Sequence, residues 1–272
     1  MFRGRYIHVR LTLSLHHTVM ASLKIRLRAF GMHLALSMVV AALAATLVFG
    51  LWYPYPYRAL SGGRELFLLL MGVDVVIGPV ITFFIYNPIK KLRRELLLDL
   101  ALVGLLQMAA LGYGLWTVSQ ARPVHLVFEY SRFSVAHANQ VPDALLDRVP
   151  QGIVPLPWTG PTLLSLRPFK NTQERMDATV AAMSGAPLPG RVDLWQPYPM
   201  ARDAVLQQAR PLSELRTRFP EMGGQMDELL RTVGQTWERS AYLPLVGRKM
   251  AWTVVIDNQS ADVIGFLPVD PF

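Results

Sequence analysis

Three long apolar runs constrain the fold of this chain more than any other feature of the sequence. They extend from His33 to about Tyr53, from Leu66 to Tyr86 and from Leu96 to about Val118. A helix needs about 20 mostly apolar residues to cross the hydrocarbon core of a bilayer, so each run is long enough. Because a spanning segment must satisfy its own backbone hydrogen bonds, the sequence predicts a membrane domain of three transmembrane helices over residues 33–118.

Composition supports a lipid-embedded front part followed by a separate polar part. Of the 272 residues, 52% are hydrophobic and 17% are charged, whereas soluble domains carry about 25% charged residues. Residues 1–121 contain 12 basic and 4 acidic residues, which accounts for the whole net charge of +8. The remaining residues carry no net charge, so the sequence gives no reason to expect nucleic acid as a partner.

The positions of lysine and arginine predict how the helices are oriented. Basic residues precede the first apolar run and fill the link between the second and third runs: Lys24, Arg26, Arg28, Lys90, Lys91, Arg93 and Arg94. The link between the first two runs has only Arg58 and Arg64. Because cytoplasmic loops carry the excess of positive charge, we expect residues 1–32 to be a basic cytoplasmic segment. Three spans then place residues 119–272 on the opposite, outer side of the membrane.

The first 19 residues leave two interpretations open. They are basic, and Met20 begins a segment that resembles a natural start just before a membrane span. Residues 1–19 are therefore either an over-extended start or a short cytoplasmic or interfacial helix.

The second apolar run contains a single carboxylate, Asp74, close to a Gly78-Pro79 pair. A charged group in the middle of a span costs several kcal/mol, so it usually faces protein or water. Pro79 has no N–H to donate to the preceding turn, which predicts a kink and a freed backbone group. Two explanations stay open. One is a hydrogen bond to Gln107 or Tyr113 of the third run, and the other is a contact with the transmembrane helix of another protein.

A second intramembrane carboxylate, Asp99, stands about one turn into the third run. Its neighbours in the predicted turn between helices are Asn87, Lys90 and Lys91. The spacing favours an ion pair that anchors this turn over a direct functional role.

The polar part predicts an α+β domain with antiparallel strands. Strands are expected at 124–130, 132–136, 162–166, 252–256 and 263–269, with the first two and the last two forming hairpins. Helices are expected after Asn171, at 200–209, after Pro211 and at 221–240. Asn171 and Glu174 have the spacing of a capping box. The methionines of the 221–240 helix are expected to face the core.

The sequence offers no catalytic or metal-binding pattern. It has no cysteine, and it lacks the nucleophile-elbow, phosphate-loop, dinucleotide, zinc-protease and EF-hand motifs. His125 and His137 are expected at surface or edge positions. We therefore expect no cofactor, no metal and no enzymatic activity.

Several segments resemble one known family. These are "DVVIGPVITFFIYNPIKK" from Asp74, "RRELLLDLALVGLLQMAALGYGLWTVSQARPVHLVF" from Arg93, and the terminal "IGFLPVDPF". They are similar to the TfpX/TfpZ family of type IV pilin accessory proteins. The matching block contains Asp74, Gly78, Pro79, Asn87, Pro88, Lys90, Asp99 and Gln107, which we take as a candidate partner or structural site in the membrane.

The resemblance implies a non-enzymatic, chaperone-like protein that supports the stability or assembly of a type IV pilin subunit. Its partners would be the pilin transmembrane helix, the pilin head and the lipid bilayer. Two other functions remain as alternatives: an ion-coupling subunit that uses Asp74, and a membrane-anchored sensor with an outer ligand-binding domain. The oligomeric state stays open.

Overall fold

The computed structural model describes residues 3–89 and 91–272, and the side chains from residue 20 onward except that of residue 66. The chain forms two compact units. The first, here called the helical unit, comprises Met1–Thr46 and Glu65–Thr117. The second, here called the sheet unit, comprises Leu47–Arg64 and Val118–Phe272.

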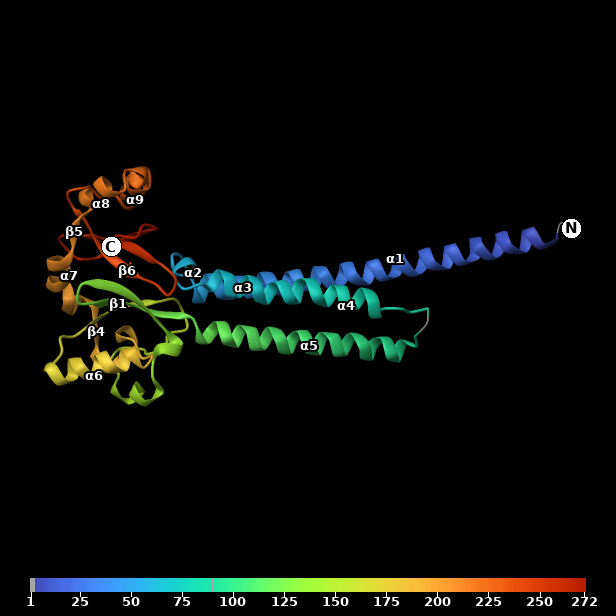
Figure 1. Ribbon diagram of the computed structural model, residues 1–272, viewed down its shortest axis with the longest axis horizontal. Coiled ribbons are helices and arrows are strands. Elements are labelled where there is room, and N and C mark those ends of the chain that lie inside the picture. Colours follow the sequence, from blue (N-terminus) through green and yellow to red (C-terminus); the bar gives the residue numbers. More distant parts are fainter. Residues whose placement is uncertain (1–2, 90) are drawn as a thin grey trace. The chain divides into compact units, whose positions relative to one another are not determined.

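Long helices make up the first unit. They are α1 (Arg3–Ala45), α3 (Gly63–Gly72), α4 (Gly78–Ile85) and α5 (Arg93–Gln120), with a π-helical turn at Val73–Ile77. A second π-helical turn, Thr46–Trp52, follows α1 and belongs almost wholly to the sheet unit. Three stretches of the described chain are long and apolar enough to cross a membrane: Met20–Trp52, Gly63–Ile85 and Arg93–Gln120. Each contains most of one predicted apolar run. Helix α1 packs along α4 (Figure 1).

Among the described residues, eight strands form one sheet in the second unit. They are β1 (Pro123–Glu129), β2 (Arg132–His137), β3 (Thr162–Leu166), β4 (Trp195–Pro197), β5 (Arg210–Pro211), β6 (Ser240–Val246), β7 (Ala251–Asp257) and β8 (Val263–Leu267). Their order is β4-β3-β1-β2-β6-β7-β8, and β5 pairs with β6. The two predicted hairpins, β1–β2 and β7–β8, are confirmed as antiparallel pairs.

The prediction of an antiparallel domain is wrong in part, because the sheet is mixed. Strand β3 pairs with β1 in parallel, and β2 pairs with β6 in parallel. Strand β6 lies outside the predicted strands. The helix expected at 221–240 reaches the first residue of β6, and β6 contains Pro244, a residue that central strands rarely contain. The helix in question, α9 (Gly223–Val233), ends at Gly234 in a left-handed conformation with φ 68°. This conformation suits glycine and stops the helix.

The other helices of the sheet unit are α2 (Tyr57–Leu60), α6 (Thr172–Met183), α7 (Arg202–Gln208) and α8 (Leu212–Arg218). Short 3₁₀ turns lie at Ala138–Gln140, Asp143–Arg148, Leu188–Gly190, Val192–Leu194, Tyr198–Ala201 and Pro220–Met222. Helices begin at 172 and 212, immediately after Asn171 and Pro211, as expected. On α9, Met226 is fully buried, so this methionine faces the core as predicted.

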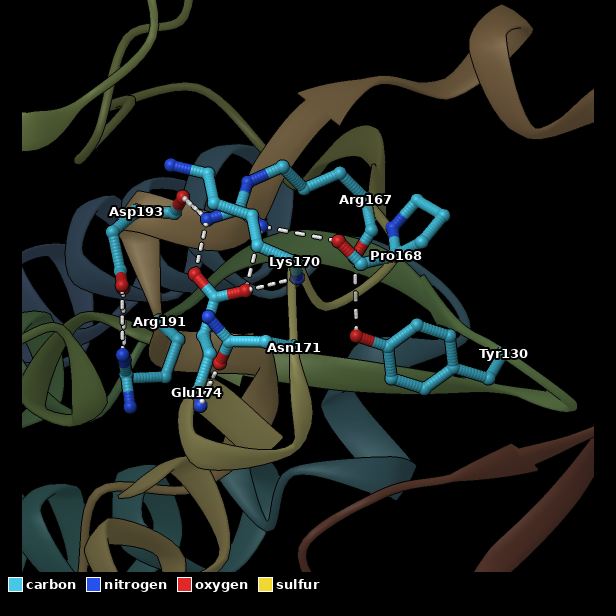
Figure 2. Close-up of polar contacts among 8 residues, drawn as sticks. All are labelled: Tyr130, Arg167, Pro168, Lys170, Asn171, Glu174, Arg191 and Asp193. Atoms are coloured by element: carbon cyan, nitrogen blue, oxygen red, sulfur yellow. Dashed lines mark hydrogen bonds and ion pairs between the residues drawn. The ribbon is translucent and has the colours of Figure 1, made fainter. Parts of the chain in front are cut away.

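A polar cluster around Glu174 fixes the start of α6 to the end of β3 (Figure 2). The Asn171 side chain accepts a hydrogen bond from the Glu174 backbone N–H at 2.8 Å and so caps the helix. The Glu174 carboxylate accepts two bonds from Arg167, at 3.0 and 2.7 Å, and one from the Lys170 backbone N–H at 2.6 Å. The bonds from Arg167 and Lys170 lower the pKa of Glu174 to about 2.

The link between the first two apolar helices forms part of the core of the sheet unit. Leu60 is fully buried and Tyr57 nearly so, and both belong to one cluster with Phe128 and Leu243 of the sheet. Tyr53 donates its hydroxyl proton to the Val118 carbonyl at 3.1 Å. The sequence analysis includes this link in the membrane domain of residues 33–118. The residues that bury Tyr57 and Leu60 are far away in the chain, so no local pattern indicates their contact with the sheet.

Arg122 and His125 are buried and hold the proline-rich loop that follows residue 154. Arg122 donates to the carbonyls of Leu156 and Pro157, each at 3.3 Å, and its guanidinium stacks over Trp158. His125 contacts Thr162 Oγ1 at 2.7 Å through Nδ1 and the Pro155 carbonyl at 3.0 Å through Nε2.

The expected surface positions of His125 and His137 are therefore wrong. Their side chains are 0% and 1% exposed. Their strands, β1 and β2, lie inside the sheet rather than at its edges. Strand β3 pairs with β1 on one side of this hairpin and strand β6 pairs with β2 on the other. Burial lowers the pKa of each histidine to about 4, against the opposing effect of the hydrogen bonds that each accepts or donates.

Candidate functional site

Three polar side chains from three different helical segments meet inside the helical unit. His33 lies on α1, Thr82 on α4 and Gln107 on α5. His33 Nδ1 lies 2.6 Å from Thr82 Oγ1, and His33 Nε2 lies 2.8 Å from Gln107 Oε1. Thr82 is 2% exposed. Polar bonds of this kind connect apolar helices that otherwise have little to distinguish one packing from another.

The bonds of this cluster run in one direction. Gln107 Oε1 can only accept a hydrogen bond, so His33 Nε2 carries the proton. In a neutral imidazole, His33 Nδ1 then accepts the proton of the Thr82 hydroxyl. The Gln107 amide donates in turn to the backbone carbonyl of Asp74 at 3.1 Å. Both ring nitrogens of His33 are therefore paired within the cluster.

The carbonyl of Asp74 accepts this bond because its own helix does not satisfy it. In a π-helical turn, the carbonyl of residue i accepts from the N–H of residue i+5. For Asp74 that residue is Pro79, which has no N–H. The predicted consequence of Pro79, a freed backbone group near Asp74, is present, although the helix responds with a π turn rather than with a simple α-helical kink.

Gly78 gives Gln107 the room to reach this carbonyl. A Cβ atom at position 78 would lie 1.9 Å from Gln107 Nε2, which is much closer than any non-bonded contact. Any side chain at position 78 therefore forces the Gln107 amide to move. Pro79 thus leaves the Asp74 carbonyl without an N–H from its own helix, Gln107 supplies the missing donor, and Gly78 leaves room for it.

The carboxyl group of Asp74 is the part of this site that remains unsatisfied. Its Oδ2 atom is buried and has no hydrogen-bond partner among the residues that the structure describes. Asp74 and Gln107 line a cavity of about 170 Å³ together with His33, Ser37, Ala41 and Gly104. A buried oxygen without a partner costs free energy comparable to a lost hydrogen bond, so a group that paired with Asp74 Oδ2 would stabilise the site.

A second and larger cavity lies against the same cluster. It measures about 540 Å³, and His33, Leu36 and Gly104 line both cavities. Arg28 and Tyr86 line this second cavity but not the first. Leu36 is 63% exposed, and Gly104 has no atom within 4 Å of the place where a Cβ would stand. The space between α1 and α5 is therefore open at the surface of the helical unit.

The other candidate residues lie at the turn between α4 and α5 and not at this cluster. Lys91 Nζ and Asp99 Oδ2 form an ion pair at 2.5 Å, which gives Asp99 one of its expected partners. Asn87 Oδ1 is buried and has no hydrogen-bond partner within the described part of the chain. Pro88 follows it in the same turn, and Lys90 lies outside the described residues.

Tyr113, the alternative partner for Asp74, packs instead against Trp116, with ring centroids 5.8 Å apart. The sequence reasoning missed His33 and Thr82 as members of the site. His33 stands at the start of its apolar run, where a histidine resembles a boundary residue, although an ionisable group within such a run is itself a signal of function. No group of three or more metal-ligating side chains is found among the residues whose side chains are described.

Comparisons with known proteins identify relatives along most of the chain. A family model described as "Fimbrial assembly protein FimB" matches residues 21–62. Two Dichelobacter nodosus proteins, named fimbrial assembly protein of serogroup I and of serogroup E1, are 34% and 33% identical over 250 residues. Each match covers 89% of this chain and 94% of the relative. No solved structure matches the chain. The chain therefore belongs to the family of fimbrial assembly proteins, in agreement with its resemblance to type IV pilin accessory proteins.

Proposed function

We propose that the protein is an inner-membrane accessory protein that holds a type IV pilin subunit before its assembly. Its three apolar helices cross the membrane, residues 1–32 lie in the cytoplasm and residues 119–272 lie in the periplasm. The distribution of Lys and Arg supports this orientation. The names of the relatives refer to fimbrial assembly and not to catalysis, which supports a chaperone-like, non-enzymatic role.

One observation carries the proposal: the unpaired carboxyl oxygen of Asp74 beside open cavities between α1 and α5. A pilin waiting for assembly is held in the membrane by one apolar helix. Any polar group on that helix is costly in lipid unless another group pairs with it. In our proposal the helix enters the space between α1 and α5, and Asp74 pairs with a polar group near its amino terminus.

The hydrogen bonds among His33, Thr82 and Gln107 leave the Asp74 carboxyl group free to pair with the pilin helix. Gln107 satisfies the backbone of residue 74, and His33 satisfies Gln107, so neither needs the carboxyl group. The small lining residues Ser37, Ala41 and Gly104 let a partner helix approach closely, as small residues do at membrane helix interfaces. The partner therefore contributes the one hydrogen bond that the cluster lacks.

The test compares Asp74→Ala with Asp99→Ala in cells that make the cognate pilin. Both changes remove an intramembrane carboxylate, but Asp99 already has Lys91 as an internal partner. We expect Asp74→Ala to lower the level of pilin and of surface pili, and Asp99→Ala to leave pilin closer to its normal level. Immunoblots of pilin and of the accessory protein measure both quantities.

A third variant, Asp74→Asn, separates two ways of pairing. An asparagine keeps a hydrogen-bond donor and acceptor but carries no charge, so it retains function if Asp74 acts in its protonated form. It loses function if Asp74 forms an ion pair with the pilin amino group. Unchanged pilin and piliation in Asp74→Ala, with the variant protein accumulating normally, would refute the proposed role.

A further inference from the structure

Strand β8 forms one end of the sheet and pairs only with β7 among the described strands. The backbone N–H and C=O groups along its other edge therefore have no strand partner. Natural proteins usually protect such an edge with charged residues or prolines. The five residues of β8, Val263–Leu267, read Val-Ile-Gly-Phe-Leu and contain neither.

A groove of about 510 Å³ runs beside this strand. Residues 263–268 line one side of it, and Gln225, Glu228 and Thr232 of α9 line the other. Gly265 brings the two elements together, because a Cβ at this position would lie 2.5 Å from Leu229 Cδ1 of α9. The groove thus has a strand edge along one wall and a helix along the other.

We propose that this groove binds an extended segment of a partner protein, which adds to the sheet as a strand beside β8. A free strand edge offers donors and acceptors at the spacing of another strand, and the groove receives alternate side chains of the added segment. Five residues of β8 span about 17 Å, which sets a partner segment of about five residues. An added strand satisfies the free backbone groups along the whole length of β8, which neither a helix nor a compact small molecule can do.

The occupant is the head of the pilin subunit, and this assignment rests on the function proposed above. Tyr55 also lines the groove, and it stands three residues after Trp52, where the first apolar helix ends. The groove wall at Tyr55 is therefore three residues along the chain from the end of a candidate membrane span, which suits a partner that is anchored in the same membrane. Glu228 forms an ion pair with Arg231, so the groove does not require a charged segment.

Site-specific photocrosslinking of the full-length protein in cells that make the pilin tests the inference. The crosslinking residue is placed at Gln225 and, as a matched control, at Val180, an exposed helical position on α6 of the same unit. We expect a crosslink to pilin from position 225 and none from position 180. A second crosslinking position, Met108 in the membrane cavity, reports on the membrane site independently.

A blocking variant sharpens the experiment. Thr232→Trp places a large ring in the groove, whereas Thr179→Trp changes the same residue type at an exposed position on α6. We expect the first change to lower the crosslink from position 225 about tenfold, equivalent to about 1.4 kcal/mol of binding, and the second to leave it unchanged. Near-ultraviolet circular dichroism verifies that both variants fold.

Each other outcome overturns the inference in a recognisable way. A crosslink from position 225 to a second copy of this chain would assign the edge to self-association. Crosslinks to pilin from position 108 but not from 225 would refute the groove and leave the proposed function standing. No pilin crosslink from 108 or 225, with unchanged pilin levels in Asp74→Ala, would refute both.

Discussion

Replacing Gly78 with alanine tests whether Gln107 depends on the empty space at that position. A Cβ at position 78 would lie 1.9 Å from Gln107 Nε2, so the amide must swing away. It then loses its bonds to His33 and to the Asp74 carbonyl. Gly72 provides a matched control in the same apolar run, because a Cβ there meets no atom within 4 Å.

The expected size of the effect follows from the two lost bonds. Hydrogen bonds between membrane helices contribute about 0.6–1.7 kcal/mol each, so the loss of two costs about 1–3 kcal/mol. Alanine in place of glycine within a helix returns about 0.5–1 kcal/mol at either position. We therefore expect Gly78→Ala to destabilise the helical unit by up to about 2.5 kcal/mol and Gly72→Ala to stabilise it by about 0.5–1 kcal/mol.

The assay uses the absence of cysteine from the natural chain. A single cysteine introduced at Ala44, which is 6% exposed, becomes reactive to a thiol reagent when the helical unit opens. The extent of labelling along a titration of denaturing detergent reports the stability of that unit in each variant. Equal midpoints for Gly72→Ala and Gly78→Ala would refute the role that we assign to Gly78 and Gln107.

Two further predictions concern the sheet unit. Leu60→Ala, which leaves a cavity in its core, is expected to lower its unfolding free energy by about 2–5 kcal/mol. Leu51, which is 46% exposed and belongs to the same unit, serves as a control. Equal urea midpoints for both alanine variants would contradict the burial of the link. His125 and His137 have folded pKa values of about 4 against an ordinary value of 6.5, so the unfolded chain binds more protons between these values. Their stabilising effect is complete above pH 6.5 and is lost as the pH falls toward 4, by about 3 kcal/mol for each histidine. A urea midpoint that stays constant from pH 7 to pH 4.5 would argue against two buried neutral histidines.

Local sequence patterns were sufficient to predict some elements of the fold. The β1–β2 hairpin, the 162–166 strand and the Asn171 cap each depend on residues within a few positions of one another. Strand β6 could not be found in this way, because its neighbours in the sheet, β2 and β7, stabilise a segment that contains Pro244. The helical pattern that continued through Ser240 also concealed the stop at Gly234.

Burial by residues far away in the chain accounts for the other differences between the predicted and the observed fold. The link containing Tyr57 and Leu60 looked like a short connection between membrane helices, yet it packs against strands more than 60 residues away in the chain. His125 looked like a surface residue because the loop that covers it, around Pro155, has no regular pattern. Neither feature leaves a periodic signal in the sequence.

The candidate site was predictable in part. Asp74 and Pro79 are conspicuous in an apolar run, and Gln107 was one of two partners considered. The sequence did not indicate that Gln107 would bond the backbone of residue 74 and leave its carboxyl oxygen unpaired. His33 was missed because it stands at the edge of its run, where it resembles a boundary residue.

The central claim is that the space between α1 and α5 receives the transmembrane helix of a pilin. Met108 lines the cavity beside Asp74 on α5, whereas Leu106 lies about 200° around the same helix and lines neither cavity described here. Photocrosslinking from these two positions in pilin-producing cells tests the claim most directly. We predict a crosslink to pilin from position 108 and little from position 106. Equal capture from both positions, or capture of lipid alone from position 108, would contradict the account.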